Sequence, residues 1–321
     1  MSPAADQIRE IDSSDIDSVF SELSSETSPV VLRGLAANWP LVQKSKESNA
    51  AAMSYLLEFY EDSPVKAFVS EADIGGRMFD TETLADTNFR QITTELNWVL
   101  DTLQKLESEP APPTVYMGSA ALDLYLPGLS AANSLPHDDI NATIRIWLGN
   151  RTTVAAHYDV FDNIACVCAG RRRFTVFPPE QLENLYIGPI DFTPAGQSIS
   201  LVDLKDPDFD KYPRFAEALK HSQSTVLEPG DAIFIPSMWW HHVEGLEAFN
   251  ILINHWWRDA PVYMAPPGDA LLHAILGIRD LPDAQRKAWQ VFFNHYIFEA
   301  DSESVEHIPP DSRGLLGELD E

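Results

Sequence analysis

The second half of the chain carries its clearest pattern of hydrophobic and polar positions. From Thr143 onward, short runs rich in apolar residues recur at regular spacing, separated by Gly, Pro and Asn. The runs are TIRIWLG, TVAAHYDV, NIACVCAG, RRFTVFPP, STVLEPGDAIFIP, HHVEGL and AFNILINHWW. This rhythm is typical of antiparallel strands in a sandwich or barrel. It predicts a mainly β core of the jelly-roll type with flanking helices.

The first 110 residues mix two periodicities and predict helices and strands that pack on this core. Apolar and acidic positions alternate over residues 1–28, which predicts a surface helix after Ser13, Ser14 and Asp15. Apolar stripes at helical spacing predict further helices at 47–61 and 92–106. Strands are predicted at 29–35, 63–71, 77–80 and 111–120, with turns at Asn38-Trp39-Pro40 and Gly75-Gly76.

The chain becomes helical again after Pro261. A short helix is predicted at 268–277, and a longer one runs from Asp280 to about Phe298. One side of the longer helix carries an aromatic stripe, made of Trp289, Phe292, Phe293, Tyr296 and Ile297. Such a stripe needs a partner surface, either the β core or the same helix of a second subunit. We divide the chain into an N-terminal region at 1–110, the core at 111–260, C-terminal helices at 261–300 and a frayed acidic tail at 301–321.

The composition adds a strong charge bias. The 321 residues include 22 basic and 49 acidic ones, which gives a formal net charge of −27. Such a chain repels phosphate backbones, because affinity for nucleic acid depends on cationic contacts. The dense basic run Arg171-Arg172-Arg173 alternates along a predicted strand and forms no exposed stripe. Nucleic acid is therefore a disfavoured partner, and a basic protein or peptide is easier to reconcile with this charge.

Membrane spans and secretion signals are not predicted. No run of 18 or more apolar residues exists, and the acidic N-terminus lacks an apolar segment of the secretory type. Cys166 and Cys168 lie two apart in a predicted strand, so they share one face and are poorly placed for a mutual disulfide. We expect a cytoplasmic protein with reduced thiols.

Two histidines and one aspartate suggest a metal site. His157 and Asp159 lie two apart in the run TVAAHYDV, so a strand would point both to the same side of a sheet. His241 lies on a later predicted strand that sheet pairing can bring near. Two imidazoles and one carboxylate leave part of a metal's coordination sphere open, as in non-haem Fe(II) oxygenases. His157, Asp159 and His241 are therefore the candidate metal ligands.

The residues alone leave other assignments open. His137 and Asp139 repeat the same spacing, but they follow a proline in an irregular segment. His242 competes with His241, because adjacent strand residues point to opposite faces and only one of the two can face the metal. His255 is a third candidate. The plain alternative is that these are hydrogen-bonded core histidines without a metal.

A longer set of motifs resembles a known family. HYDVFDNIACVCAGRRRFTVFPPEQLENLY is followed by VDLKDPDFDKYPRF, EPGDAIFIPSMWWHHVE and ILINHWW. Together these segments resemble the cupin-like JmjC family of Fe(II)- and 2-oxoglutarate-dependent oxygenases, and within it the asparaginyl hydroxylase that inhibits the hypoxia-inducible factor. The resemblance is strong from about 111 to 260 and weaker at PVVLRGLAANWP and in the C-terminal helices. It implies a double-stranded β-helix, or cupin, core.

The resemblance implies a role for each residue of the candidate site. His157, Asp159 and His241 would hold Fe(II). Arg172 stands where the family usually has a lysine that binds the far carboxylate of 2-oxoglutarate, and a guanidinium can bind a carboxylate through two hydrogen bonds. If Arg172 points inward, the arginines on either side of it should point away.

Further positions match residues around the family's co-substrate. Tyr116 matches a tyrosine that helps to hold the same carboxylate. Asn163 and Asn254 match two asparagines near the co-substrate and the metal, and Trp256 matches an aromatic residue that lines the site. These four residues complete the candidate co-substrate site around Arg172.

The resemblance also implies an activity with its own substrate preference. Val154 stands where the relative has a threonine that contacts the co-substrate, and Gly118 where it has a glutamine that contacts the substrate. We expect O2 and 2-oxoglutarate to be consumed while a C–H bond is hydroxylated, first of all in a protein or peptide side chain. A small-molecule substrate and a non-catalytic metal-binding or assembly module are the alternatives. A homodimer through the C-terminal helices is also implied.

Overall fold

The structure, a computed structural model, describes residues 6–11, 13, 20, 23, 25–78, 87–135, 142–190, 198–261 and 263–317. It consists of two units, Met1–Arg258 and Asp259–Glu321, which are described separately. The first unit contains two β-sheets, and the second contains helices and helical turns. Within the described residues, no helix combines the length and the apolar character needed to cross a bilayer.

The smaller sheet has six strands and carries two of the candidate ligands. Its central strands pair antiparallel, and the short strand at each edge pairs parallel with its neighbour. In spatial order the strands are β1 (Asp6–Gln7), β12 (Gln223–Leu227), β11 (Arg172–Phe177), β14 (Trp240–Gly245), β9 (Thr153–His157) and β5 (Arg77–Met78). Because β9 and β14 are neighbours, His157 and His241 are brought side by side.

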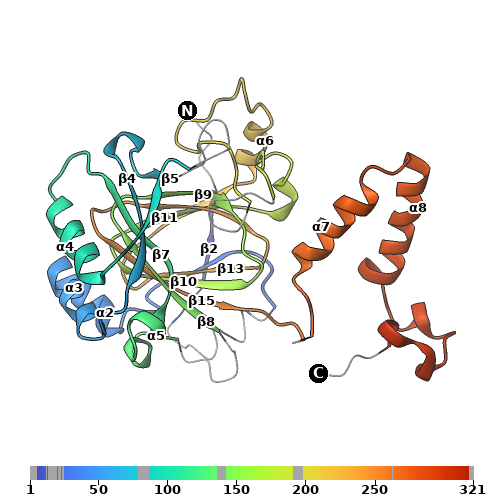
Figure 1. Ribbon diagram of the computed structural model, residues 1–321, viewed down its shortest axis with the longest axis horizontal. Coiled ribbons are helices and arrows are strands. Elements are labelled where there is room, and N and C mark those ends of the chain that lie inside the picture. Colours follow the sequence, from blue (N-terminus) through green and yellow to red (C-terminus); the bar gives the residue numbers. More distant parts are fainter. Residues whose placement is uncertain are drawn as a thin grey trace. The chain divides into compact units, whose positions relative to one another are not determined.

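The larger sheet has nine strands and forms the second layer of the first unit (Figure 1). Apart from the parallel pair β2 and β3, its strands run antiparallel. In spatial order they are β2 (Arg9–Ile11), β3 (Val30–Leu32), β13 (Ala232–Ile235), β10 (Asp162–Ala169), β15 (Asn250–Trp257), β8 (Thr143–Gly149), β7 (Thr114–Ala121), β4 (Val65–Ser70) and β6 (Arg90–Thr94). This pair of largely antiparallel sheets confirms the predicted jelly-roll core.

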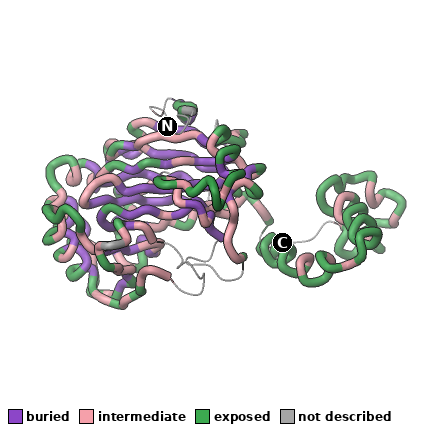
Figure 2. Tube along the Cα trace, turned by 90° about the horizontal axis from the view of Figure 1, so that it is seen from above, coloured by how far each residue is buried: buried purple, intermediate pink, exposed green. Residues whose placement is uncertain are grey.

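The core forms two layers, one on each face of the larger sheet. Val167 and Leu252 of the larger sheet pack against Phe174 and Val243 of the smaller sheet. On the other face, a second apolar cluster lies beneath α2 (Pro40–Glu47), α3 (Asn49–Leu57) and α4 (Leu96–Leu106). Burial on both faces explains why runs such as IACVCA lack a polar side, and why the strands are drawn largely as buried in Figure 2. The thiols of Cys166 and Cys168 are free and buried there.

Residues 6–11 precede the helix predicted after Asp15, and no strand was predicted there. They form β1 and β2, which add to the edges of the two sheets and bury Ile8 and Ile11. Pairing with existing strands therefore outweighs the local alternation. The predicted helix after Asp15 falls mostly outside the described residues, where only Phe20 and Leu23 of its apolar positions are described and are helical.

One predicted helix boundary was wrong, and one helix was missed. The predicted helix at 92–106 begins only at Leu96, because Arg90–Thr94 pairs with β4 as strand β6. The turn predicted at Asn38-Trp39-Pro40 is present at Asn38, and helix α2, which was not predicted, follows it directly with Pro40 in its first turn, where a missing N–H costs nothing. Other short helices of the unit are η1 (Ala72–Ile74), α5 (Leu122–Tyr125) and η2 (Leu129–Ala131).

The described part of the connection between β11 and β12 covers the outer face of the smaller sheet. It contains η3 (Pro179–Gln181) and α6 (Phe215–Lys220). Phe215 packs there with Phe177 and Trp240 of the sheet. The smaller sheet thus has buried apolar residues on both faces near the candidate ligands.

The second unit contains the helices predicted at the C-terminus. They are α7 (Pro267–Ile278), α8 (Asp283–Phe293) and the π-helical turn η4 (Asn294–Phe298), and none of their residues is buried. The aromatic stripe forms, with ring centroids 5.6 Å apart for Trp289 and Phe292 and 6.2 Å for Phe292 and Tyr296. The tail predicted to fray contains three short turns, η5 (Glu303–Val305), η6 (Pro310–Ser312) and η7 (Gly314–Leu316).

Candidate metal centre

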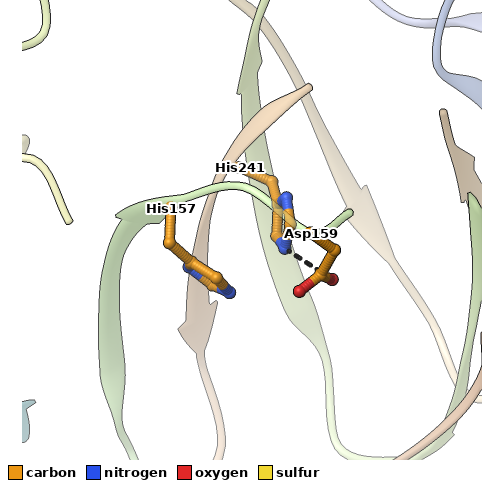
Figure 3. A group of neighbouring side chains, drawn as sticks. All are labelled: His157, Asp159 and His241. Carbon is orange, nitrogen blue, oxygen red and sulfur yellow. Dashed lines mark ion pairs between the residues drawn. The ribbon is translucent and has the colours of Figure 1, made fainter. Parts of the chain in front are cut away.

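His157, Asp159 and His241 converge at one end of β9 and β14 (Figure 3). Each offers one ligand atom, and the three atoms lie within 4.8 Å of one another. His157 and His241 are register partners, and their ring centroids are 4.2 Å apart. Nε2 of His241 lies 3.6 Å from Oδ2 of Asp159. The three donors therefore surround a volume suited to one metal ion.

Asp159 reaches this point from a loop, not from a strand. Strand β9 ends at His157, so the i, i+2 argument does not place the carboxylate. The loop is instead held by the backbone N–H of Met238, which donates to the carbonyl of Asp159 at 2.8 Å. A second N–H, from Ser237, donates to the carboxylate of Asp162 at 2.9 Å. The turn that precedes β14 therefore positions the loop that carries Asp159.

Both imidazoles are held in the tautomer that a metal requires. Nδ1 of His157 lies 2.8 Å from the carbonyl of Ala155, and Nδ1 of His241 lies 3.1 Å from the carbonyl of Trp239. A carbonyl only accepts, so each Nδ1 carries the proton and each Nε2 keeps its lone pair. Such hydrogen bonds fix the ring orientation of metal-binding histidines.

Burial keeps His241 neutral over the physiological range. Burial first, and the neighbouring imidazole of His157 second, lower the pKa of His241, to about 4. Asp159 and the carbonyl of Trp239 act in the opposite direction. Because only the neutral ring can donate its lone pair, this histidine is ready to bind a metal at neutral pH.

The rival histidines do not join this group. His242 points to the other face of the smaller sheet, where burial lowers its pKa to about 4. His255 faces the helix side of the larger sheet, where its ring packs edge-on to Trp39 and its Nε2 lies 3.1 Å from the hydroxyl of Ser134. His137 lies outside the described residues. Within the described chain, His241 is thus the histidine that accompanies His157 and Asp159.

All eight residues predicted for the site line one pocket between the two sheets. The pocket is lined by Tyr116, Trp147, Val154, His157, Asp159, Asn163, Arg172, Phe174, His241, Val243, Leu252, Asn254 and Trp256. Trp147 was not predicted as a site residue from the sequence. It lies in the predicted strand TIRIWLG, on the same face as Arg145. The structure therefore brings the candidate metal ligands and the candidate co-substrate residues together.

Arg172 lies at the closed end of this pocket and is only 2% exposed. Its guanidinium interacts with the hydroxyl of Tyr116, and its Nε has no hydrogen-bond partner among the described residues. Burial lowers the pKa of Arg172 and raises that of Tyr116. Arginine stays charged even so, and no carboxylate of the described chain pairs with it. A buried cation of this kind calls for an anionic ligand.

The neighbours of Arg172 point away, as predicted. Arg171 pairs with Glu247 at 2.7 Å, and Arg173 pairs with Glu244 at 3.0 Å. Both side chains are about half exposed, whereas Arg172 is buried. Strand alternation therefore explains why only the middle arginine of the run reaches the pocket.

Asn163 and Asn254 connect the candidate metal ligands to the larger sheet. Nδ2 of Asn163 lies 3.5 Å from Oδ2 of Asp159, and Nδ2 of Asn254 donates to Oδ1 of Asn163 at 2.7 Å. The carboxylate accepts only, so it sets the orientation of both amides in turn. Oδ1 of Asn254 is left buried without a partner among the described residues.

Aromatic rings line the pocket along the larger sheet. Tyr116 stacks on Trp147, Trp147 meets Trp256 edge-on, and Trp256 stacks on Phe161, with centroids 6.0–6.3 Å apart. A Cβ added at Gly118 would lie 3.0 Å from the Tyr116 ring and 3.3 Å from the Trp147 ring. The rings therefore leave little room for a larger side chain at Gly118.

The donor set fits a divalent metal with a chelating dicarboxylate. Two neutral Nε2 atoms and one carboxylate are ligands that Fe(II) accepts, and they leave coordination positions for other molecules. The unpaired guanidinium of Arg172 lies in the same pocket, where a second carboxylate could reach it. The site thus has the layout of a mononuclear metal centre with an adjoining anion site.

Comparison with known proteins agrees with this class of site. A family model described as "Cupin-like domain" matches residues 16–263. This range covers most of the chain, every strand except β1 and β2, and every residue of the pocket. The chain belongs to the cupin-like domain family, and the cupin-type core expected from the sequence is confirmed.

Several curated relatives are similar over parts of the chain. Lysine-specific demethylase JMJ31 of Arabidopsis thaliana is 33% identical over 43% of this chain and 24% of its own length. tRNA wybutosine-synthesizing protein 5 of Gallus gallus is 32% identical over 54% of this chain and 45% of its own. Lysine-specific demethylase 8 of Xenopus tropicalis is 27% identical over 71% of this chain and 48% of its own. The chain thus spans less than half the length of these relatives.

Proposed function

We propose that the chain is an Fe(II)- and 2-oxoglutarate-dependent oxygenase that hydroxylates a C–H bond, first of all in a protein or peptide side chain. One observation supports this best. A group of two histidines and one carboxylate shares a pocket with a buried arginine that has no carboxylate partner among the described residues. The group suits Fe(II), and the arginine suits the far carboxylate of a dicarboxylate.

Each pocket residue has a proposed role. His157, Asp159 and His241 hold the metal, which when bound supplies the oxidative chemistry that turns 2-oxoglutarate and O2 into succinate, CO2 and a product hydroxyl. Arg172 and Tyr116 hold the far carboxylate of 2-oxoglutarate at the closed end. Asn163 and Asn254 keep Asp159 in position, and Trp256 helps to exclude water.

The substrate class is part of the proposal. Two of the relatives are named as lysine-specific demethylases and one is named for tRNA wybutosine synthesis. The net charge of −27 favours a protein or peptide over nucleic acid, because a negative surface repels a phosphate backbone. A small molecule is the second candidate, because the pocket is lined largely by apolar and aromatic groups. The sequence resemblance to the asparaginyl hydroxylase also favours a side-chain hydroxylation.

Spectroscopy and product analysis test the proposal together. Adding Fe(II) and 2-oxoglutarate without O2 is expected to produce a charge-transfer absorbance band with the wild-type protein and none with His157→Ala. On admission of air, the wild-type protein is expected to release succinate. Mass spectrometry of host proteins and metabolites from wild-type and His157→Ala strains would then identify the product by the gain of one oxygen atom.

Other outcomes have clear meanings. Metal binding without succinate, with or without host extract, would favour a non-catalytic metal-binding module. Identical spectra for the wild-type protein and His157→Ala would contradict the proposed site. Succinate release without a modified macromolecule, but with a modified metabolite, would move the substrate to the small-molecule class.

We also propose that the chain forms a dimer through the helices at 261–300. The catalytic core at 111–260 is a separate region of the chain. Within the second unit, α7, α8 and η4 bury none of their residues. Leu276, Trp289, Phe292 and Ile297 are each at least 45% exposed. Two short helices that bury no core are not stable in isolation, so an apolar partner is required.

Light scattering tests this dimer. The full-length chain is expected to have twice the mass of one chain, and Trp289→Glu with Phe292→Glu is expected to lower it to one. The matched control is Lys287→Glu, which places the same charge on a hydrophilic position of α8, 73% exposed, and should leave the mass unchanged. A single-chain mass for the wild-type protein would remove the dimer and favour the β core as the partner of the stripe.

A further inference from the structure

A second arginine, Arg145, lies next to the pocket, toward the end opposite Arg172. Arg172 and Tyr116 are 2% and 5% exposed and mark the closed end, whereas Phe161, stacked on Trp256, is 38% exposed and marks the open end. Arg145 lies near that open end, two residues after the exposed Thr143 at the start of β8. Arg145 belongs neither to the candidate metal ligands nor to the candidate co-substrate site.

Strand geometry places Arg145 on the pocket side of the larger sheet. It shares a face of β8 with Trp147, which lines the pocket, while Ile146 and Leu148 pack in the cluster under the helices. Its register partner on β15 is Asn254, which also lines the pocket. Arg145 is therefore a direct neighbour of the lining residues Trp147 and Asn254 without lining the pocket itself. It lies on the side of the open end, from which a substrate would enter.

The guanidinium of Arg145 is only partly satisfied. One nitrogen donates to the carbonyl of Ser119 at 3.3 Å, in the irregular part of β7. Its Nε is buried and has no hydrogen-bond partner among the described residues, and no described carboxylate forms an ion pair with it. A buried donor on a charged group without a partner is rare in folded proteins and points to a missing ligand.

A second buried donor belongs to the neighbouring strand β15. Nε1 of Trp256 also has no partner among the described residues, and Trp256 stands on β15 two residues after the register partner of Arg145. Two N–H donors on adjacent strands, one of them charged, suit a group with two acceptor oxygens. A carboxylate has this form and accepts charge-assisted hydrogen bonds well.

We propose that Arg145, with Nε1 of Trp256, binds a carboxylate of the primary substrate, so that the pocket selects an acidic side chain. This inference rests on the proposed oxygenase function and deepens it. Arg172 binds the carboxylate of the co-substrate at the closed end, and Arg145 binds that of the substrate at the open end. Arg145 is thus a specificity-determining residue for the same site.

A basic protein partner and an acidic side chain in the pocket are compatible. The charge of −27 acts over the whole surface and favours encounter with a basic protein. It is screened beyond about 8 Å at physiological ionic strength. Contact with Arg145 occurs within that range, so a basic partner can still present an acidic side chain to the pocket.

Peptide binding tests the inference without requiring turnover. The probes are three pools of blocked pentapeptides that differ only at the central residue, which is Asp or Glu, Asn or Gln, or Lys. Calorimetry is performed on the protein loaded with Mn(II) and 2-oxoglutarate. The acidic pool is expected to bind the wild-type protein about 10- to 100-fold more tightly than the amide pool, as a charge-assisted hydrogen bond would provide.

Variants at position 145 and a matched control separate the outcomes. Arg145→Gln is expected to remove the acidic preference, and Arg145→Lys to keep part of it. Arg171→Gln removes the same charge from the outer surface, where Arg171 pairs with Glu247, and should keep the full preference. Thermal melting confirms that each variant is folded.

Three results would overturn the inference: the same preference in the wild-type protein and Arg145→Gln, tighter binding of the amide or lysine pool, or no binding of any pool. Failure of the oxygenase proposal is recorded separately, as the absence of a charge-transfer band with Fe(II) and 2-oxoglutarate. If that band forms and the acidic preference is absent, only the role of Arg145 is rejected.

Discussion

Replacing His241 with leucine is expected to abolish Fe(II) binding, whereas the same replacement at His242 is expected to preserve it. His241 offers one of three ligand atoms that lie within 4.8 Å of one another, while His242 faces the opposite side of the sheet. Loss of a group that merely orients a ligand costs about 10- to 100-fold in metal affinity, so loss of a ligand should cost more than about 100-fold. Turnover should fall to background with it.

The two variants form a matched pair. Leucine keeps a side chain of similar size at adjacent buried positions, so packing changes are comparable. Neither ring nitrogen of His242 has a hydrogen-bond partner among the described residues, so His242→Leu should raise the free energy of unfolding by about 1–3 kcal/mol. Anaerobic Fe(II) titration against a competing chelator measures the affinity, and urea unfolding measures the stability. Loss of metal only in His242→Leu would exchange the roles of the two histidines.

Replacing Arg172 with methionine is expected to weaken 2-oxoglutarate binding and to stabilise the protein without ligand. Truncating one partner of a buried, hydrogen-bonded charge pair costs about 2–5 kcal/mol, which corresponds to about 30-fold or more in affinity. In the absence of the co-substrate, the same change removes a buried cation without a carboxylate partner. The free energy of unfolding should therefore rise, by about 1–4 kcal/mol.

Thermal melting with and without 2-oxoglutarate measures both effects of Arg172→Met. The co-substrate should raise the Tm of the wild-type protein and leave that of the variant almost unchanged. Arg171→Met, which breaks an exposed ion pair with Glu247, should behave like the wild-type protein. Arg172→Lys keeps the charge but loses the fork of donors, so an intermediate affinity is expected. An unchanged response to 2-oxoglutarate in Arg172→Met would place the co-substrate carboxylate elsewhere.

Strand alternation accounts for much of what the sequence predicted correctly. It separated Arg172 from its two arginine neighbours, and it required that only one of His241 and His242 face the site. The apolar rhythm after Thr143 predicted the antiparallel core, because turn residues recur between its strands. These inferences succeeded because side-chain direction in a strand is a local property.

Local patterns failed where sheet pairing overrode them. No strand was predicted at residues 6–11, yet they form β1 and β2 at the sheet edges, because unpaired backbone groups of β12 and β3 offered partners. Ile92 fitted a helical stripe but belongs to β6, which pairs with β4. In both cases the deciding hydrogen bonds join residues far apart in the chain.

Some features of the candidate site follow from local sequence, and others depend on tertiary contacts. The sequence by itself determined the ligand types, the opposite directions of Arg172 and its two arginine neighbours, and the antiparallel core, because these depend on residue identity and on alternation along one strand. Only the tertiary structure decided that Asp159 approaches from a loop held by Met238, and that His157 faces His241. It also decided that Arg145 and Trp256 leave donors without partners at the open end. These features depend on contacts between distant strands, whose register no local pattern specifies.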